Sequence, residues 1–147
     1  FDSTLSTNQS KVTLDGDPQH AGFQFRASNE VAESTFNKTY YIRPNDGKDS
    51  MGNTKNWPQN KDMKNLNWKA QSVVIGNVRY YTLYLDHKKN PKPSFYSERD
   101  YGRFGSYFKS SVTPDRPLDV KYRLIFGTKE LSPQDCSSYS SKFLNQL

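Results

Sequence analysis

Two stretches rich in β-forming residues, Ala70–Ile75 (AQSVVI) and Val78–Leu85 (VRYYTLYL), decide the fold, because only Gly76-Asn77 separates them. A two-residue Gly-Asn connection between such stretches is typical of a tight β-hairpin. Within the second stretch, side chains alternate between two faces: Tyr80, Thr82 and Tyr84 on one, and Arg79, Tyr81, Leu83 and Leu85 on the other. The sequence therefore predicts an antiparallel hairpin in the middle of the chain.

Further strands are predicted on both sides of this hairpin. Phe23–Ala27 alternates apolar and polar residues, which directs Phe23 and Phe25 to the core, and Thr39–Arg43 and Leu118–Phe126 also read as strands. Ser132-Pro133 is a helix-start signal, and the helix would carry Cys136, Tyr139 and Phe143 on one face. We expect six or seven mostly antiparallel strands, arranged as an all-β sandwich with a short C-terminal helix.

Length and composition bound the class of protein. The chain has 147 residues, which favours one domain, and 14 % of them are aromatic, which argues against disorder. No apolar run approaches the roughly 20 residues of a membrane-spanning helix. We expect residues 1–147 to form a single sandwich domain or one half of a larger one, and residues 45–67 to form a long loop.

The chain lacks the residues of common metal and cofactor sites. One cysteine, Cys136, excludes an internal disulfide framework and a cysteine-cluster metal site, and two histidines cannot form an all-histidine zinc site. There is no phosphate-binding loop, dinucleotide fingerprint or nucleophile elbow, so no metal or cofactor is expected. The net charge of +6 favours anionic partners, but it is spread along the chain, so nucleic-acid binding ranks last.

A first group of polar residues lies where strands end. Asp86-His87 follows the hairpin, and Glu98-Arg99-Asp100 lies in a later turn. His87, Glu98, Arg99 and Asp100 could together perform acid–base chemistry, with the histidine as acid or base and the arginine as an anion clamp. The alternative is a loop junction held by ion pairs of Arg99.

Two further groups could bind a ligand. His20, Gln24 and Arg26 could hold a polyhydroxylated or carboxylated molecule, because arginine offers a bidentate fork; the alternative is a solvated sheet face. Aromatic rings in loops stack on sugars and on nucleobases, and the alternative for most of them is core packing. These rings belong to Trp57, Trp68, Tyr96, Tyr101 and Tyr107.

Several segments resemble an uncharacterised family of secreted bacterial proteins that is often labelled automatically as methane oxygenase PmoA. They are Asp15–Ala27, Thr39–Pro44, Asn56–Pro58, Tyr84–His87, Asn90-Pro91, Pro117–Leu124 and, most specifically, Tyr96–Phe108. The chain has neither membrane spans nor a copper-ligand set, so it does not support that label.

The resemblance implies a galactose-mutarotase-like sandwich, carbohydrate handling and a secreted or periplasmic location. Family members are about twice as long, so this chain resembles their C-terminal half, and the histidine-rich segment of the other half is absent. We therefore expect a partner, either the missing half or a second copy, with Leu118–Phe126 as the exposed edge. Two functions remain open: acid–base chemistry on a glycan within a longer chain, or a non-catalytic carbohydrate-binding or structural domain.

Overall fold

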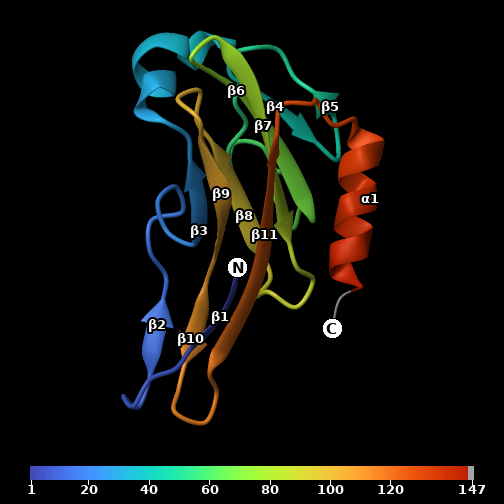
Figure 1. The fold of residues 1–147 in the computed structure, drawn as a ribbon. Helices are drawn as coiled ribbons and strands as arrows, with labels where there is room; N and C mark the ends of the chain where they lie inside the picture. Colours follow the sequence, from blue (N-terminus) through green and yellow to red (C-terminus); the bar gives the residue numbers. More distant parts are fainter. Residues whose placement is uncertain (146–147) are drawn as a thin grey trace.

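The predicted hairpin forms the centre of a six-stranded antiparallel sheet in a computed structural model, which describes residues 1–145 (Figure 1). β6 (Trp68–Ile75) and β7 (Val78–Asp86) pair along their whole length. Gly76 and Asn77 both have positive φ, as a two-residue hairpin turn requires. The strand order is β1-β11-β7-β6-β4-β5. The outer strands are β1 (Asp2–Leu5), β11 (Leu118–Gly127), β4 (Tyr40–Arg43) and β5 (Gly47–Lys48).

A three-stranded sheet covers one face of the large sheet and a helix covers the other (Figure 1). The small sheet has the order β3-β9-β8, with β3 (Phe23–Arg26), β9 (Arg103–Phe108) and β8 (Ser94–Glu98). β2 (Val12–Leu14) and β10 (Ser110–Val112) form a separate ribbon, and α1 (Pro133–Leu144) is the covering helix. Two short helical turns, η1 (Val31–Thr35) and η2 (Phe36–Lys38), precede β4.

The all-β sandwich with a C-terminal helix is thus confirmed, although residues 1–145 contain eleven strands rather than six or seven. Three of the additional strands, β1, β5 and β10, are two to four residues long, and β8 has five residues. Such short segments hold too few residues to show an alternating pattern.

Alternating side chains of the large sheet build two separate cores. The core under α1 contains Trp68, Leu83, Leu85, Cys136 and Phe143. The core between the two sheets is mostly aromatic, with Tyr41, Tyr84, Tyr96, Phe104 and Tyr122. The two faces predicted for β7 are confirmed, since Leu83 and Tyr84 belong to different cores.

The helix begins as the sequence predicts, with a reciprocal cap between Ser132 and Asp135. The prediction for Tyr139 is wrong, because its side chain is 42 % exposed. The buried face consists of Cys136, Ser140 and Phe143, and the last two lie four and seven residues after Cys136. Burial raises the pKa of Cys136 to about 12, so this thiol is a packed, protonated side chain.

The segment 45–67 runs along the outer edge of β8. Asn65 N donates to Ser94 O at 2.8 Å, Tyr96 N donates to Met63 O at 3.0 Å, and Trp57 N donates to Tyr96 O at 3.1 Å. These contacts satisfy backbone groups that an edge strand would otherwise expose. No helix within residues 1–145 is long and apolar enough to cross a membrane.

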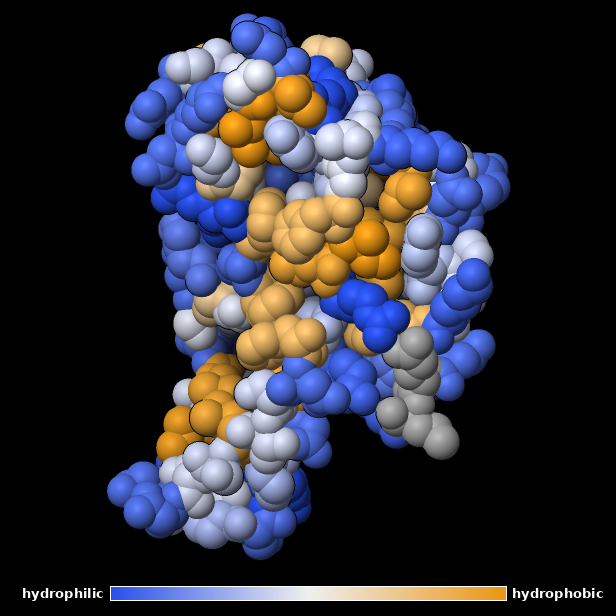
Figure 2. All heavy atoms as spheres, in the orientation of Figure 1, coloured by the Kyte–Doolittle hydropathy of each residue, from blue (hydrophilic) through white to orange (hydrophobic). Residues whose placement is uncertain are grey.

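One edge of the large sheet is apolar and partly open. β1 pairs with β11 only over Leu118–Lys121, and beyond Tyr122 the strand order places no further strand on that side among residues 1–145. Phe1 and Phe126 are 65 % and 61 % exposed. Figure 2 shows apolar residues gathered in a band down the middle of this face. An open strand edge beside exposed rings is a surface suited to strand addition.

We expect the isolated chain to self-associate through this edge. Phe126→Lys places a charge on it and should shift the average mass measured by light scattering toward that of one chain. Val78→Lys, at an exposed apolar position of the hairpin, is the matched control and should leave the mass unchanged. A parent chain that stays monomeric at high concentration would contradict this expectation.

Candidate binding site

The three-stranded sheet has one apolar and one polar face. Phe23, Phe25, Tyr96 and Phe104 point toward the large sheet and pack in the aromatic core. The intervening residues therefore point to the opposite face, which we call the outer face. It carries Gln24, Arg26, Phe95, Ser97, Arg99, Arg103, Gly105 and Tyr107.

Strand register aligns three arginines in one row across this face. Arg26 is paired with Arg103 between β3 and β9, and Arg99 N donates to Arg103 O at 2.8 Å just beyond β8. We call these three residues the arginine row. Like charges placed directly opposite each other on a sheet are destabilising, so the row needs compensating groups.

Neutral groups supply part of this compensation. Arg26 donates to Asn29 Oδ1 at 3.3 Å, and its guanidinium lies 5.6 Å from the ring centroid of Tyr101. Arg99 donates to Asn56 Oδ1 at 3.0 Å and also contacts Gln19 Oε1. Within residues 1–145, no carboxylate forms an ion pair with any arginine of the row.

Arg103 is the least satisfied member of the row. Its Nε donates to the Tyr101 hydroxyl at 3.2 Å, whereas Nη1 and Nη2 are buried and have no hydrogen-bond partner. Arg103 as a whole is 7 % exposed. Buried donors without partners are rare in folded proteins and commonly mark a position that a water, ion or ligand fills.

Unpaired polar atoms are concentrated on this face. Seven buried side-chain atoms of residues 1–145 lack a partner, and four of them are Gln24 Oε1, Ser97 Oγ and the two Arg103 Nη atoms. Gly105 separates Ser97 and Gln24 in the register, and a Cβ there would lie 2.2 Å from Phe23 O. Glycine thus lets β3 approach β9 closely.

The turn between β2 and β3 lies against the outer face. Ala21 O accepts from Gln24 Nε2 at 2.9 Å, and Gln19 contacts Arg99. The pKa of Asp17 is lowered, first by the Gln19 backbone N–H, then by His20 and by the charge of Arg103. A cavity of about 470 Å³ opens beside the turn and is lined by Thr13, Leu14, Asp15, Gly16, Ala21, Gly22, Tyr107 and Phe108.

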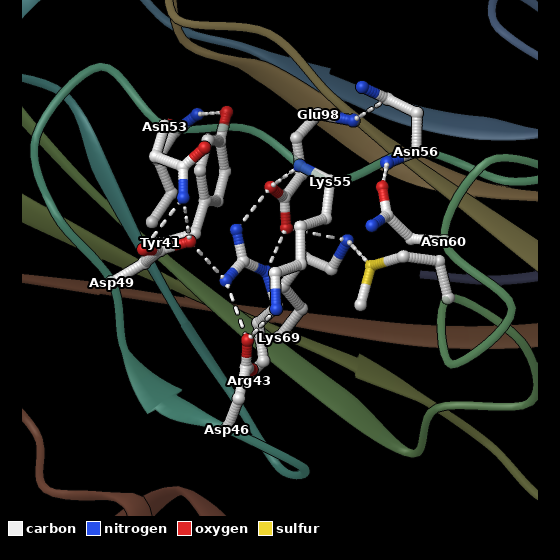
Figure 3. Close-up of polar contacts among 12 residues, drawn as sticks. Tyr41, Arg43, Asp46, Asp49, Asn53, Lys55, Asn56, Asn60, Lys69 and Glu98 are labelled. Carbon is white, nitrogen blue, oxygen red and sulfur yellow. Dashed lines mark hydrogen bonds and ion pairs between the residues drawn. The ribbon is translucent and has the colours of Figure 1, made fainter.

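Behind this face, a buried network of charges joins the two sheets (Figure 3). Glu98 of β8 accepts from Arg43 of β4 through two parallel hydrogen bonds, Nε–Oε1 and Nη2–Oε2, both 2.7 Å. Lys69 Nζ of β6 lies 3.0 Å from Glu98 Oε1. All three side chains are fully buried, so we call Arg43, Lys69 and Glu98 the interior triad.

The charges of the interior triad fix its protonation. Burial alone would raise the pKa of Glu98, but Lys69 and Arg43 outweigh it and hold that pKa below its ordinary value. Burial lowers the pKa of Lys69, partly offset by Glu98. Because Glu98 is ionised and buried between two cations, it is a structural ion-pair partner.

The triad also anchors the loop of residues 45–67 (Figure 3). Arg43 Nη1 lies 2.7 Å from Asp49 Oδ2, and Lys55 N donates to Glu98 Oε2 at 2.9 Å. Asn56 Oδ1 then accepts from both Glu98 N at 2.7 Å and Arg99 Nη1 at 3.0 Å. One asparagine therefore connects the buried ion pairs to the arginine row.

The tyrosine core supports the row from below. The Tyr41 hydroxyl lies 2.7 Å from Arg99 O and 3.2 Å from Arg103 O, and it accepts from Gln71 Nε2 at 2.8 Å. Burial raises the pKa of Tyr41 well above its ordinary value, so the hydroxyl remains a hydrogen-bond donor.

The four residues grouped for acid–base chemistry do not meet at one place. His87 is 1 % exposed, and its ring packs against Phe143 of α1, 5.2 Å between centroids. Glu98 faces the opposite side of the large sheet, in the interior triad. Arg99 lies on the outer face, and Asp100 follows it in the turn, where its carboxylate accepts from Tyr101 N.

The ligand-binding group is brought together more closely. Gln24, Arg26 and Tyr101 lie on or beside the outer face, and His20 lies in the covering turn, in contact with Asp17. Trp57 is half-buried at the β8 edge and stacks on Phe95, 4.7 Å between centroids. Trp68 lies elsewhere, in the core under α1.

Sequence reasoning missed Arg103, Ser97 and the interior triad partners Arg43 and Lys69. The alternation in Tyr101–Phe108 does place Arg103 opposite Phe104, and that signal could have indicated an outward arginine. Strand register, which aligns Arg103 with Arg26 and Arg99, depends on contacts between distant segments.

Replacing Glu98 tests the interior triad. We expect Glu98→Gln to lower the free energy of unfolding by about 3–5 kcal/mol, because it leaves two buried cations without their anion. Asp2→Asn, which affects the exposed pair with Lys121, is the matched control and should cost at most about 1 kcal/mol. Urea unfolding followed by circular dichroism measures both, and equal losses would contradict the role of Glu98.

Acid should remove the stabilisation that the ionised Glu98 side chain contributes. The folded-state pKa of Glu98 lies below the ordinary 4.5, so its stabilisation is complete above that value and disappears as the pH falls through the folded-state pKa. The stability difference between the parent chain and Glu98→Gln should therefore be constant above about pH 5 and shrink below it. A difference that persists undiminished in acid would contradict an ionised Glu98.

No group of three or more histidine, cysteine, aspartate or glutamate side chains within residues 1–145 is arranged to hold a metal ion.

The chain matches a family described as a family of unknown function, DUF6807, over residues 1–141. Neither a curated protein sequence nor a solved structure matches it. The family match agrees with the expected uncharacterised domain and tests neither the methane oxygenase label nor the mutarotase-like fold. Because the match spans nearly the whole chain, this protein belongs to the DUF6807 family.

Proposed function

We propose that this protein is a carbohydrate-binding domain whose ligand site is the outer face of the three-stranded sheet. The observation that carries the proposal is the cluster of four buried, unpaired polar atoms on Gln24, Ser97 and Arg103. Such atoms are costly in a folded protein unless water or a ligand completes their hydrogen bonds.

The chemistry of these atoms suits sugar hydroxyls. Gln24 Oε1 and Ser97 Oγ accept hydrogen bonds, whereas the Arg103 nitrogens only donate. A hydroxyl group both donates and accepts, so neighbouring hydroxyls of one sugar ring could serve both kinds of partner. The cavity of about 470 Å³ beside the turn is lined on the outer face by Tyr107, and its volume lies within the usual range of small-molecule sites.

An aromatic edge completes the proposed site. Trp57 stacks on Phe95, and Phe95 is opposite Tyr107 in the register. Lys61 Nζ lies 4.8 Å from the Trp57 ring centroid, on a side chain long enough to move aside. Half-buried rings beside hydrogen-bonding groups favour sugars, whose faces are apolar and whose edges are polar.

The geometry favours binding over acid–base turnover. Of the residues considered for catalysis, His87 and Glu98 are buried on opposite sides of the large sheet, and Glu98 is occupied by two cations. Arg99 and Asp100 remain near the outer face and would act as binding groups. A secreted or periplasmic location, implied by the family resemblance, would place the domain where polysaccharides occur.

Two substitutions test the site. Gln24→Ala and Trp57→Ala should each weaken binding to the best ligand of a glycan array by about tenfold, which corresponds to one hydrogen bond or one stacking contact of about 1.4 kcal/mol. Gln134→Ala, on the exposed side of α1, is the control and should bind normally. Isothermal titration calorimetry measures the affinities, and a folded parent chain that binds no glycan would contradict the proposal.

A further inference from the structure

The three positive charges of the arginine row repel one another, and no carboxylate among the described residues forms an ion pair with them. Arg26, Arg103 and Arg99 lie on adjacent strands, which are about 4.8 Å apart in a β-sheet. A guanidinium stays charged at every physiological pH, so none of the three can relieve the repulsion by losing its proton. Because no carboxylate in the described part of the chain forms an ion pair with the row, a bound anion would neutralise it.

Arg103, at the centre of the row, offers hydrogen-bond donors that suit an anion. Its two Nη atoms are buried and unpaired, while Nε is fixed by the Tyr101 hydroxyl at 3.2 Å. The pair of terminal nitrogens forms a planar fork that matches two oxygens of a carboxylate or sulfate. The flanking arginines each keep neutral partners, Asn29 and Asn56, so their positive charge is not cancelled.

We propose that the arginine row selects carbohydrates that carry an oxyanion, either the carboxylate of a uronic acid or a sulfate ester. This inference rests on the proposed carbohydrate site and specifies its ligand class. The oxyanion accepts from the Arg103 fork between Arg26 and Arg99. Hydroxyl groups of the same sugar then reach Gln24 and Ser97, which lie level with Gly105, two residues further along β9 than Arg103.

The ligand reaches Arg103 by displacing the turn that covers it. Asp17, Pro18 and His20 are exposed, so moving this turn sacrifices little apolar burial. Its contacts with the sheet are polar, from Gln19 to Arg99 and from Ala21 to Gln24. Asp17 brings a carboxylate under the electrostatic influence of Arg103 without forming an ion pair, so it competes with the ligand.

An acidic sugar fits this site better than a nucleic acid. Nucleic-acid binding draws its affinity from many lysine and arginine contacts to successive phosphates. Among the described residues, Arg103 is the one arginine whose two Nη atoms are buried without a partner, and neutral hydrogen-bonding groups lie beside it. The arrangement suits one oxyanion on a polyhydroxylated ring.

Calorimetric titration with matched oligosaccharides tests the inference. The probes are an oligogalacturonate, its neutral methyl ester, a sulfated oligosaccharide of similar length and a single-stranded oligonucleotide. We expect at least one acidic oligosaccharide to bind about tenfold or more tightly than the methyl ester. The arm that binds better distinguishes carboxylate from sulfate.

Variants connect this preference to Arg103. Arg103→Gln should weaken binding of the acidic probe far more than binding of the methyl ester, so that the preference disappears, and Arg103→Lys should lose most of the preference because lysine lacks the fork. Lys88→Gln removes an exposed charge elsewhere and should have no effect. Asp17→Asn removes the competing carboxylate and should tighten binding of the acidic probe, a readout that does not depend on how Arg103 variants fold.

The outcomes separate the two proposals. Equal affinity for the acidic probe and its methyl ester overturns the oxyanion inference and leaves the carbohydrate site standing. Tighter binding of the oligonucleotide overturns the oxyanion-sugar inference. If no oligosaccharide binds, the carbohydrate proposal fails, and the inference fails with it.

Discussion

The ion pairs of Glu98 join the two sheets of this structure in its interior, where all three charged side chains are fully buried. Arg43 and Lys69 come from neighbouring strands of the large sheet, and Glu98 comes from the edge strand of the small one. A buried carboxylate is unfavourable unless cations and hydrogen-bond donors surround it. The position of Glu98 is therefore fixed by both sheets together, and so is the residue that follows it, Arg99.

Hydrogen bonds connect Glu98 to residues at the surface of the small sheet. Lys55 N and Asn56 attach the long loop to Glu98, and Asn56 passes the constraint on to the guanidinium of Arg99. Tyr41 fixes the carbonyl groups of Arg99 and Arg103 from the core side. The arginine row thus stands on a rigid base, whereas the turn above it is exposed and attached by polar contacts. A rigidly held row of charged side chains beneath a turn that can move aside is an arrangement suited to ligand binding.

The sequence was a good guide wherever the structural signal was local. The Gly76-Asn77 turn, the alternating faces of β3 and β7 and the start of α1 at Ser132-Pro133 are each determined by neighbouring residues, and each is confirmed. The prediction for Tyr139 failed because a helix of twelve residues buries only a narrow stripe, and Ser140 rather than Tyr139 lies in it.

For the site, Gln24, Arg26, Arg99 and Tyr101 could be grouped as polar candidates from sequence. Their meeting with Arg103 depends on the pairing of β3, β9 and β8, which single-sequence patterns do not define. Glu98 and His87 look like surface groups beside a turn, yet partners distant in sequence bury them both.

The most direct test of this account observes the guanidinium groups themselves. Nitrogen-15 NMR of the arginine side chains, during titration with the acidic oligosaccharide that binds best, compares Arg103 with Arg43 in one sample. Arg43 already has its carboxylate partners, so its signals should stay in place, whereas those of Arg103 should shift strongly and slow their rotation as the fork gains an oxyanion. Ligand binding that leaves the Arg103 signals unchanged would contradict the account.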